Sequence, residues 1–286
     1  MKRVLLLLGC MWVLEGPAQV LKIWTEVPLT KKQKRSEMTV YLPDPDKNTG
    51  ISVIICPGGS YCYLGIHREG HQVAKWLKSK GIAAFVLRYR VGMYGNHYPA
   101  MIQDLQRAIQ WVRMHGKEYR IHPDRVGVMG FSAGGHLAGT AGIYYEENFM
   151  EPLGIRPEVS LRPDFVAMIY PVVSMQDSIV HRKSRRNLLG RHFIPELAEK
   201  MSLEKNVRPG MPPVFLVHCR DDKTVDVRNS EVLARKLEEK GCVYRAFFYR
   251  QGNHGFGISP KRKADAGHWP ENFEKWLHQI TKEINK

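Results

Sequence analysis

The chain has 286 residues, of which 43% are hydrophobic, and a formal net charge of +15. This length suffices for one large domain with a substantial core, and no repeat or low-complexity linker marks a second domain. Lys and Arg are dispersed, apart from short clusters at 31–35 and 182–186, and no signature of a nucleic-acid-binding fold accompanies them. Nucleic acid is therefore excluded as the main partner, and the charge favours at most a general attraction to anionic glycans or cell surfaces.

Residues 1–18 have the pattern of a secretory signal peptide. Lys2 and Arg3 precede an apolar stretch that ends at Leu14, and small residues then lead to an expected cleavage site after Ala18. The stretch is too short to span a bilayer comfortably. Lipidation at the cysteine within it is the minor alternative, because the apolar run continues past that cysteine. We expect a secreted or periplasmic protein with an α/β domain over 19–286 and no membrane span.

Apolar strand-like runs alternate with helical patterns along the rest of the chain. The expected strands are 51–56, 83–89, 126–131, 165–170, 214–218 and 243–249, and the expected helices are 70–80, 100–115, 133–145, 229–240 and 269–284. This alternation indicates βαβ units and hence a mostly parallel, doubly wound α/β sheet flanked by helices. Catalytic groups in such folds gather beyond the carboxyl ends of the strands, so the loops there are the expected location of a site.

A glycine-rich loop, CPGGSY at 56–61, follows the first expected strand. Glycines let the backbone approach a substrate, so the N–H groups of this loop are candidate donors to an oxyanion. A simple glycine turn is compatible with the same residues. His67 and Glu69 come next and are candidates to line a pocket, although the favourable charge at a helix N-terminus explains Glu69 equally well.

The segment 126–139, VGVMGFSAGGHLAG, contains the strongest catalytic signal. A strand that turns directly into a helix, with small residues on both sides, forces Ser132 into a tight turn that presents its hydroxyl at the sheet edge. This is the pattern of a GxSxG nucleophile elbow. The N–H of Ala133, next in the chain, is an expected oxyanion donor. His136 lies one helical turn further on and is expected to pack or cap.

An acidic and a histidine-containing loop follow two later strands. Asp221 and Asp222 come after the strand at 214–218, and His254 lies among glycines after the strand at 243–249. A serine hydroxyl is a poor nucleophile until an imidazole accepts its proton, and the imidazole needs a carboxylate to hold its tautomer. The order Ser, Asp, His is that of the α/β-hydrolases. Asp222 is the expected acid, with Asp221 as the alternative.

The chain over residues 50–280 resembles the α/β-hydrolase esterases of the acetyl xylan esterase and feruloyl-esterase-like group, related to the hormone-sensitive-lipase group. The matching motifs are CPGGSY, HREGHQVAKWL, GIAAFVLRYR, DLQRAIQWVR, DRVGVMGFSAGGHLA, PPVFLVHCRDDKTV and GNHGFG. The resemblance implies a nucleophile, an acid, a base and three oxyanion-hole residues, which are Ser132, Asp222, His254, Gly59, Ser60 and Ala133.

Two departures from the family pattern concern this site. Relatives often begin the oxyanion loop with HGGG, whereas Pro57 and Ser60 replace the His and the last Gly here. The usual acid motif DxxVP reads DKTVD from Asp222. Backbone donors survive such changes, so the mechanism is retained while the identity of the loop donor stays open.

The resemblance implies a secreted serine carboxylesterase, without a cofactor, that removes acetyl groups from poly- or oligosaccharides. A feruloyl or lipase-like carboxylesterase is one alternative. A second is a prolyl-oligopeptidase-type peptidase, which the short stretch before residue 51 disfavours because those enzymes carry a large propeller domain. A non-enzymatic binding protein is the third, and the complete set of Ser, Asp and His argues against it.

The stretch 172–213, between two expected strands, is expected to be a small cap insert. It contains HRKSRR at 181–186. A broad apolar lid over a fatty acyl chain is difficult to build from so short and charged an insert. The insert therefore favours a small acyl group on a sugar.

Several remaining polar residues are expected to be structural. Asp104 and Arg107 lie at i, i+3 on one expected helix, which predicts an ion pair. The cysteines after residue 18 are even in number, as disulfides would need, but Cys56 and Cys219 end apolar runs and are expected to be buried free thiols. The spacing of the cysteines and histidines matches no zinc site.

Overall fold

The computed structural model describes residues 19–25, 36–258 and 264–284. The expected signal peptide at 1–18 lies outside these residues, so export stays a prediction. Within the described ranges, no helix is both long enough and apolar enough to cross a membrane.

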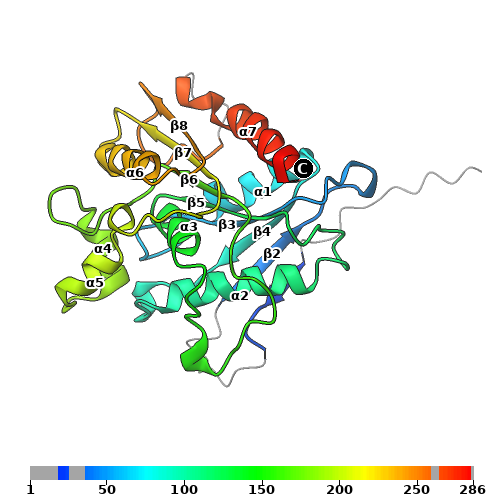
Figure 1. Cartoon of the computed structure of the whole chain (residues 1–286), viewed down its shortest axis with the longest axis horizontal. Helices are drawn as coiled ribbons and strands as arrows, with labels where there is room; N and C mark the ends of the chain where they lie inside the picture. The colour runs from blue at the N-terminus through cyan, green and yellow to red at the C-terminus, as the bar shows by residue number, and fades with distance from the viewer. Residues whose placement is uncertain (1–18, 26–35, 259–263, 285–286) are drawn as a thin grey trace, which may run out of the picture.

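One sheet of eight strands, in the order β1-β2-β4-β3-β5-β6-β7-β8, runs through the molecule (Figure 1). Its strands are β1 (Val20–Lys22), β2 (Glu37–Tyr41), β3 (Ser52–Cys56), β4 (Ala83–Arg88), β5 (Val126–Phe131), β6 (Val166–Ile169), β7 (Val214–Cys219) and β8 (Tyr244–Tyr249). Strands β1 and β2 pair antiparallel, as do β2 and β4, and the other pairs are parallel. The predicted doubly wound α/β class is confirmed, and the short strands β1 and β2 extend the sheet beyond the predicted ones.

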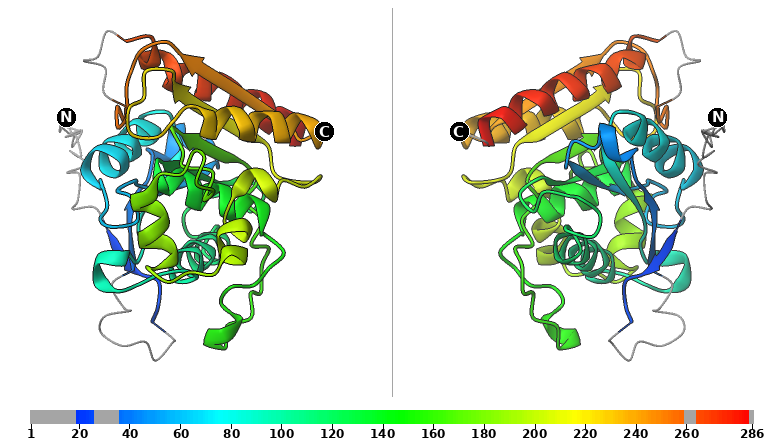
Figure 2. Two further views of the ribbon diagram at one scale, coloured as in Figure 1. Left: turned by 90° about the vertical axis from the view of Figure 1, so that its left-hand side faces the viewer. Right: turned by 90° about the vertical axis from the view of Figure 1, so that its right-hand side faces the viewer.

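Helices cover both faces of the sheet (Figure 2). On one face lie α1 (Gln72–Ser79) and α7 (Trp269–Ile284), and on the other lie α2 (Ala100–Met114), α3 (Ala133–Ile143) and α6 (Arg228–Glu239). Successive side chains of a strand point to opposite faces. Accordingly, Ile54 of β3 packs in the core under α2 and α3, while Val53 and Ile55 pack in the core under α1 and α7.

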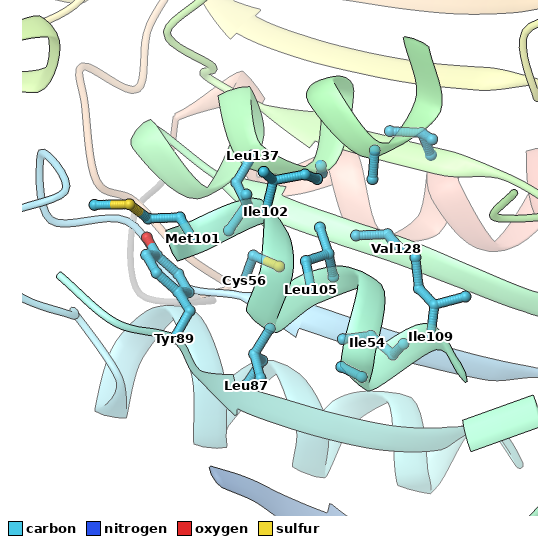
Figure 3. Packing of buried hydrophobic residues seen from close by; sticks show 14 of the residues in the cluster. Ile54, Cys56, Leu87, Tyr89, Met101, Ile102, Leu105, Ile109, Val128 and Leu137 are labelled. Atoms are coloured by element: carbon cyan, nitrogen blue, oxygen red, sulfur yellow. The ribbon is translucent and has the colours of Figure 1, made fainter. Parts of the chain in front are cut away.

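Figure 3 shows the core on the α2 side of the sheet. Leu105 and Ile109 of α2 and Leu137 of α3 lie against Ile54 and Val128, and all are at most 1% exposed. Truncating such a side chain to alanine typically costs about 2–5 kcal/mol. This packing fixes α3, and with it the turn that precedes α3, against the sheet.

The insert at 172–213 carries α4 (Arg182–Leu189), α5 (Pro195–Lys200) and a 3-10 turn, η6 (Leu203–Lys205). Both helices lie at the left of Figure 1, beyond one end of the sheet. Pro195 begins α5, where its fixed φ and missing N–H are tolerated, and Gly190 ends α4 with a φ of +89°. We call this segment the cap.

Two predicted details of the fold have different outcomes. Instead of pairing with Arg107, the buried carboxylate of Asp104 accepts hydrogen bonds from Arg90 Nε at 2.9 Å and from Trp24 Nε1 at 2.6 Å. The predicted pair between Asp104 and Arg107 is therefore wrong, because donors from other segments converge on Asp104 in the core. Cys56 and Cys219 are buried and free, as expected.

Candidate active site

Ser132 occupies the turn between β5 and α3 with φ 53° and ψ −119°. A non-glycine residue in this region is strained and needs its surroundings to hold it there. The Ser132 N–H donates to the carbonyl of Ile169 at 3.0 Å, which ties the turn to β6. A side chain at Gly134 would collide with the backbone of Cys56, which explains the glycine two residues after the serine.

A chain of hydrogen bonds joins three residues that are far apart in the sequence. The Ser132 hydroxyl lies 2.9 Å from Nε2 of His254, and Nδ1 of His254 lies 2.6 Å from Oδ2 of Asp222. His254 lies in the loop after β8 and Asp222 in the turn after β7. The carboxylate fixes the proton on Nδ1, so Nε2 is free to accept the proton of the serine.

The surroundings of Asp222 keep its carboxyl group ionised. Burial alone would raise the pKa of this carboxyl, but hydrogen bonds from His218 and His254 outweigh burial and hold the pKa well below its usual range. The backbone N–H groups of Thr224 and Val225 donate to Oδ1 at 2.8 and 2.9 Å. The permanent negative charge can stabilise an imidazolium at His254.

Asp221 contacts the histidine loop without touching the imidazole. Its carboxylate accepts hydrogen bonds from the backbone N–H groups of Gly252, at 3.1 Å, and Asn253, at 2.7 Å. Asp221 thus holds the backbone that carries His254, whereas Asp222 holds the ring.

His218, at the end of β7, is a functional neighbour that sequence reasoning missed. It is fully buried, and its Nε2 donates to Asp222 Oδ2 at 3.1 Å while its Nδ1 accepts from the Ser230 hydroxyl at 2.7 Å. The sequence signal was a histidine in an otherwise apolar strand, a position where an unpartnered polar ring would be costly.

The loop after β3 leaves several N–H groups available to a ligand. The N–H groups of Gly59, Ser60 and Ala133 have no hydrogen-bond acceptor in the described part of the chain. Gly59 has a φ of +134°, which only glycine adopts readily. Asn187 of the cap helix α4 donates to the Ser60 carbonyl at 2.9 Å and links the cap to this loop.

A buried carboxylate, Glu69, supports the same loop from below. Glu69 is 8% exposed and accepts hydrogen bonds from the Gly58 N–H and from the Tyr170 hydroxyl, both at 2.8 Å. The Tyr170 oxygen in turn accepts from the N–H of Gly257, near His254, at 3.1 Å. Burial raises the pKa of Glu69, and these hydrogen bonds partly offset the increase. Its contacts therefore connect the glycine loop with the histidine loop.

Two further histidines near the site are not part of the hydrogen-bond chain. His136 is fully buried, where its Nε2 donates to the Met201 carbonyl at 2.7 Å and its Nδ1 accepts from the Tyr61 hydroxyl at 2.8 Å, so it packs as expected. His67 is exposed and lies near Gln72. Across the described residues, no group of three or more His, Cys, Asp or Glu side chains is placed to hold a metal ion.

Two hollows adjoin these loops. The first, of about 440 Å³, is bordered by Tyr63 of the glycine loop and by Met93 and Tyr94, all three of them well exposed. The second, of about 330 Å³, lies between the start of the cap and the turn that carries Asp222, and is bordered also by His181.

Comparisons with known proteins identify the family of the chain. The BD-FAE family profile matches residues 38–237. The chain is 32% identical to an acetylxylan esterase of Xylanibacter ruminicola over 82% of its length and 31% identical to an endo-1,4-beta-xylanase B of Butyrivibrio fibrisolvens over 77%. It spans 48% and 34% of those two proteins, so about half or less of their length.

A solved structure is similar over its whole length. The acetyl ester-xyloside bifunctional hydrolase of Caldicellulosiruptor lactoaceticus superposes with a TM-score of 0.83 at 33% identity, covering 92% of this chain and 97% of that one. The profile match, the identities and the shared architecture lead to one assignment: the chain belongs to the BD-FAE family and has the α/β-hydrolase fold.

Proposed function

We propose that the protein is a serine carboxylesterase that removes small acyl groups, chiefly acetyl, from saccharides. The observation that carries the proposal is the continuous hydrogen-bond chain from Ser132 through His254 to Asp222, beside backbone N–H groups that have no acceptor among the described residues. A nucleophile, a base with a fixed tautomer, a stabilising carboxylate and oxyanion donors are the components that acyl transfer needs.

The first half of the reaction forms an acyl-enzyme. Ser132 Oγ attacks the ester carbonyl carbon as His254 Nε2 takes the hydroxyl proton, and the carbonyl oxygen becomes an oxyanion held by N–H groups from Gly59, Ser60 and Ala133. The tetrahedral species collapses, the bond to the sugar oxygen breaks, and His254 returns the proton to that oxygen. While His254 carries the proton, Asp222 stabilises its imidazolium.

The second half repeats these steps with water as the nucleophile. His254 takes a proton from water, the resulting hydroxide attacks the acyl carbon, and the bond to Ser132 Oγ breaks as His254 returns the proton to it. The products are the free acid and the regenerated serine.

The proposed substrate class rests on the relatives and on the surface beside the glycine loop. Two of the relatives carry acetylxylan esterase and acetyl ester-xyloside hydrolase in their names. The exposed Tyr63 and Tyr94 offer amphipathic rings beside the glycine loop, which suit the apolar ring faces and hydroxyls of a sugar. A sugar polymer outside the cell also fits the predicted signal peptide and a secreted or periplasmic location.

The test compares acyl groups and leaving groups separately. kcat/KM for acetyl, butyryl and octanoyl esters of one chromogenic alcohol measures acyl size, and we expect it to fall steeply from acetyl to octanoyl. Acetate release from acetylated xylo-oligosaccharides tests the sugar, and a peptide amide tests peptidase activity. A preference for octanoyl would indicate a lipase-like enzyme, and inactivity on every acetylated saccharide would contradict the proposed substrate class.

A further inference from the structure

We infer that the cap contains an anion subsite that binds the carboxylate of an acidic saccharide, such as a uronic acid branch on the acetylated chain. The inference rests on the proposed function and names a substrate class for it. The site is a hollow of about 530 Å³ at the end of α4. Its polar lining consists of four arginines and a single carboxylate, namely Arg182, Arg185, Arg186, Arg191 and Asp177.

Among the described residues, a carboxylate neutralises one of the four arginines. Arg185 Nη2 lies 2.7 Å from the Asp177 carboxylate, and its guanidinium stands 5.1 Å from the centre of the Phe193 ring. Arg182, Arg186 and Arg191 are exposed and have no carboxylate partner among the described residues. The hollow therefore presents three unneutralised guanidinium groups.

The placement of these charges is unfavourable for the free protein. Arg182 and Arg186 are an i, i+4 pair of like charges on a helix of eight residues, which destabilises such a helix. Arg182 also begins α4, where the helix dipole disfavours a cation. A bound anion would relieve both effects, whereas solvent screens them only in part.

The subsite is positioned to contact a saccharide whose ester lies at Ser132. Its hollow shares Asp177 with the 330 Å³ hollow bordered by Asp222 and His181. The same helix, α4, reaches the glycine loop through the hydrogen bond from Asn187 to the Ser60 carbonyl. In Figure 1, α4 and α5 lie together at the left, and three of the four arginines belong to α4. A saccharide chain that leaves the active site over α4 would therefore pass them.

The chemistry of the hollow favours a carboxylated sugar over other anionic partners. Guanidinium groups bind planar carboxylates through two parallel N–H···O bonds. Single-stranded nucleic acid would need exposed aromatic rings within the hollow for base stacking, and the aromatic residue that lines it, Phe193, has the Arg185 guanidinium over one face. A membrane surface would require an apolar face beside the charges, and within residues 172–213 Ile194, 63% exposed, is the one large hydrophobic side chain that is exposed.

The experiment uses two acetylated xylo-oligosaccharides that differ only in a uronic acid branch. For the wild-type protein at low salt, we expect kcat/KM for acetate release to be at least about five-fold higher on the acidic oligosaccharide, and the ratio to fall towards one in about 0.5 M NaCl. Replacing Arg186→Gln together with Arg191→Gln should make kcat/KM equal for the two oligosaccharides. The same variant should keep the wild-type kcat on a chromogenic acetate ester.

A matched control removes the same amount of positive charge outside the cap. It carries Arg156→Gln and Arg245→Gln, which replace two exposed arginines. This control should retain the wild-type ratio. Equal kcat/KM for both oligosaccharides with the wild-type protein, or a ratio that survives the loss of Arg186 and Arg191, would overturn the inference.

Direct binding separates this inference from the proposed function. Calorimetric titration of the deacetylated acidic and neutral oligosaccharides into the wild-type protein requires no catalysis. Selective binding of the acidic one, lost in the Arg186 and Arg191 variant, supports the subsite even if no acetate is released. Equal affinity for both, alongside normal acetate release, rejects the subsite and retains the esterase.

Discussion

The carboxylate of Glu69 accepts a hydrogen bond from the backbone N–H of Gly58 at 2.8 Å. The glycine loop therefore rests on a buried acidic group, and the next two N–H groups, of Gly59 and Ser60, have no acceptor in the described structure. Oriented donors stabilise an oxyanion because they need no rearrangement when the charge develops. Glu69 is thus a positioning residue for the loop.

Replacing Glu69→Gln should reduce kcat by roughly 10- to 100-fold with little change in KM. The Gly58 N–H and the Tyr170 hydroxyl use different oxygens of Glu69, and glutamine has only one acceptor oxygen for the two donors. The resulting change in donor orientation affects the transition state more than the bound ester. Tyr170→Phe, which removes only the second partner of Glu69, should have a smaller effect. Steady-state kinetics on an acetyl ester, with thermal unfolding as the check on folding, make the comparison. A normal kcat in a folded Glu69→Gln variant would contradict the role.

Ser132→Ala should reduce ester hydrolysis by about 10³-fold or more and leave the fold intact, because it removes the nucleophile and no core contact. The wild-type protein should be labelled by a serine-directed fluorophosphonate and the variant should not. The thermal unfolding midpoint provides the folding control. Near-normal turnover in the variant, or labelling that persists without Ser132, would place the nucleophile elsewhere.

Asp222→Asn should lower kcat by roughly 10³- to 10⁴-fold, because an amide does not hold the required tautomer of His254 or stabilise its positive form. Asp221→Asn is the matched neighbour. Its amide oxygen can still accept the N–H of Asn253, so a loss below about ten-fold is expected. The opposite ranking of the two variants would move the acid to Asp221.

The buried ring of His136 should make folding stability depend on pH. Burial lowers the pKa of His136 to about 4, against about 6.5 for an ordinary histidine. Between these values the unfolded chain binds a proton that the folded chain does not, so stability rises with pH. The contribution is complete above about pH 6.5 and is lost as the pH falls towards 4, by about 1.4 kcal/mol per pH unit.

Urea unfolding of the wild type and of His136→Gln at several pH values between 7.5 and 4.5 tests this expectation. Burial also lowers the pKa of His71 and His181, so the informative quantity is the difference in slope between the two proteins. The free energy of unfolding of the variant should fall less steeply with decreasing pH. Identical slopes would show that His136 does not titrate as described.

The alternation of apolar runs and helical patterns was enough to predict the sheet and its main helices. The strand at 126–131 and the helix at 269–284 match the structure at both ends, because long periodic segments carry their own burial pattern. The GxSxG turn and the order of Ser132, Asp222 and His254 likewise follow from local chemistry. These features depend on neighbours in the sequence or on the general rule that strand ends meet at one edge of a parallel sheet.

Other features depended on contacts between segments far apart in the chain. The sequence left Asp221 and Asp222 as alternatives, and only the packing of β7 against β8 places Asp222 beside the ring of His254. The sequence left Glu69 as either a pocket-lining residue or a helix-end charge, whereas its partners are Gly58 and Tyr170. A buried polar group needs hydrogen-bond partners, and in a folded chain these can come from segments that are distant in the sequence. The tertiary structure, and not the place of Glu69 in the sequence, therefore decided its contacts.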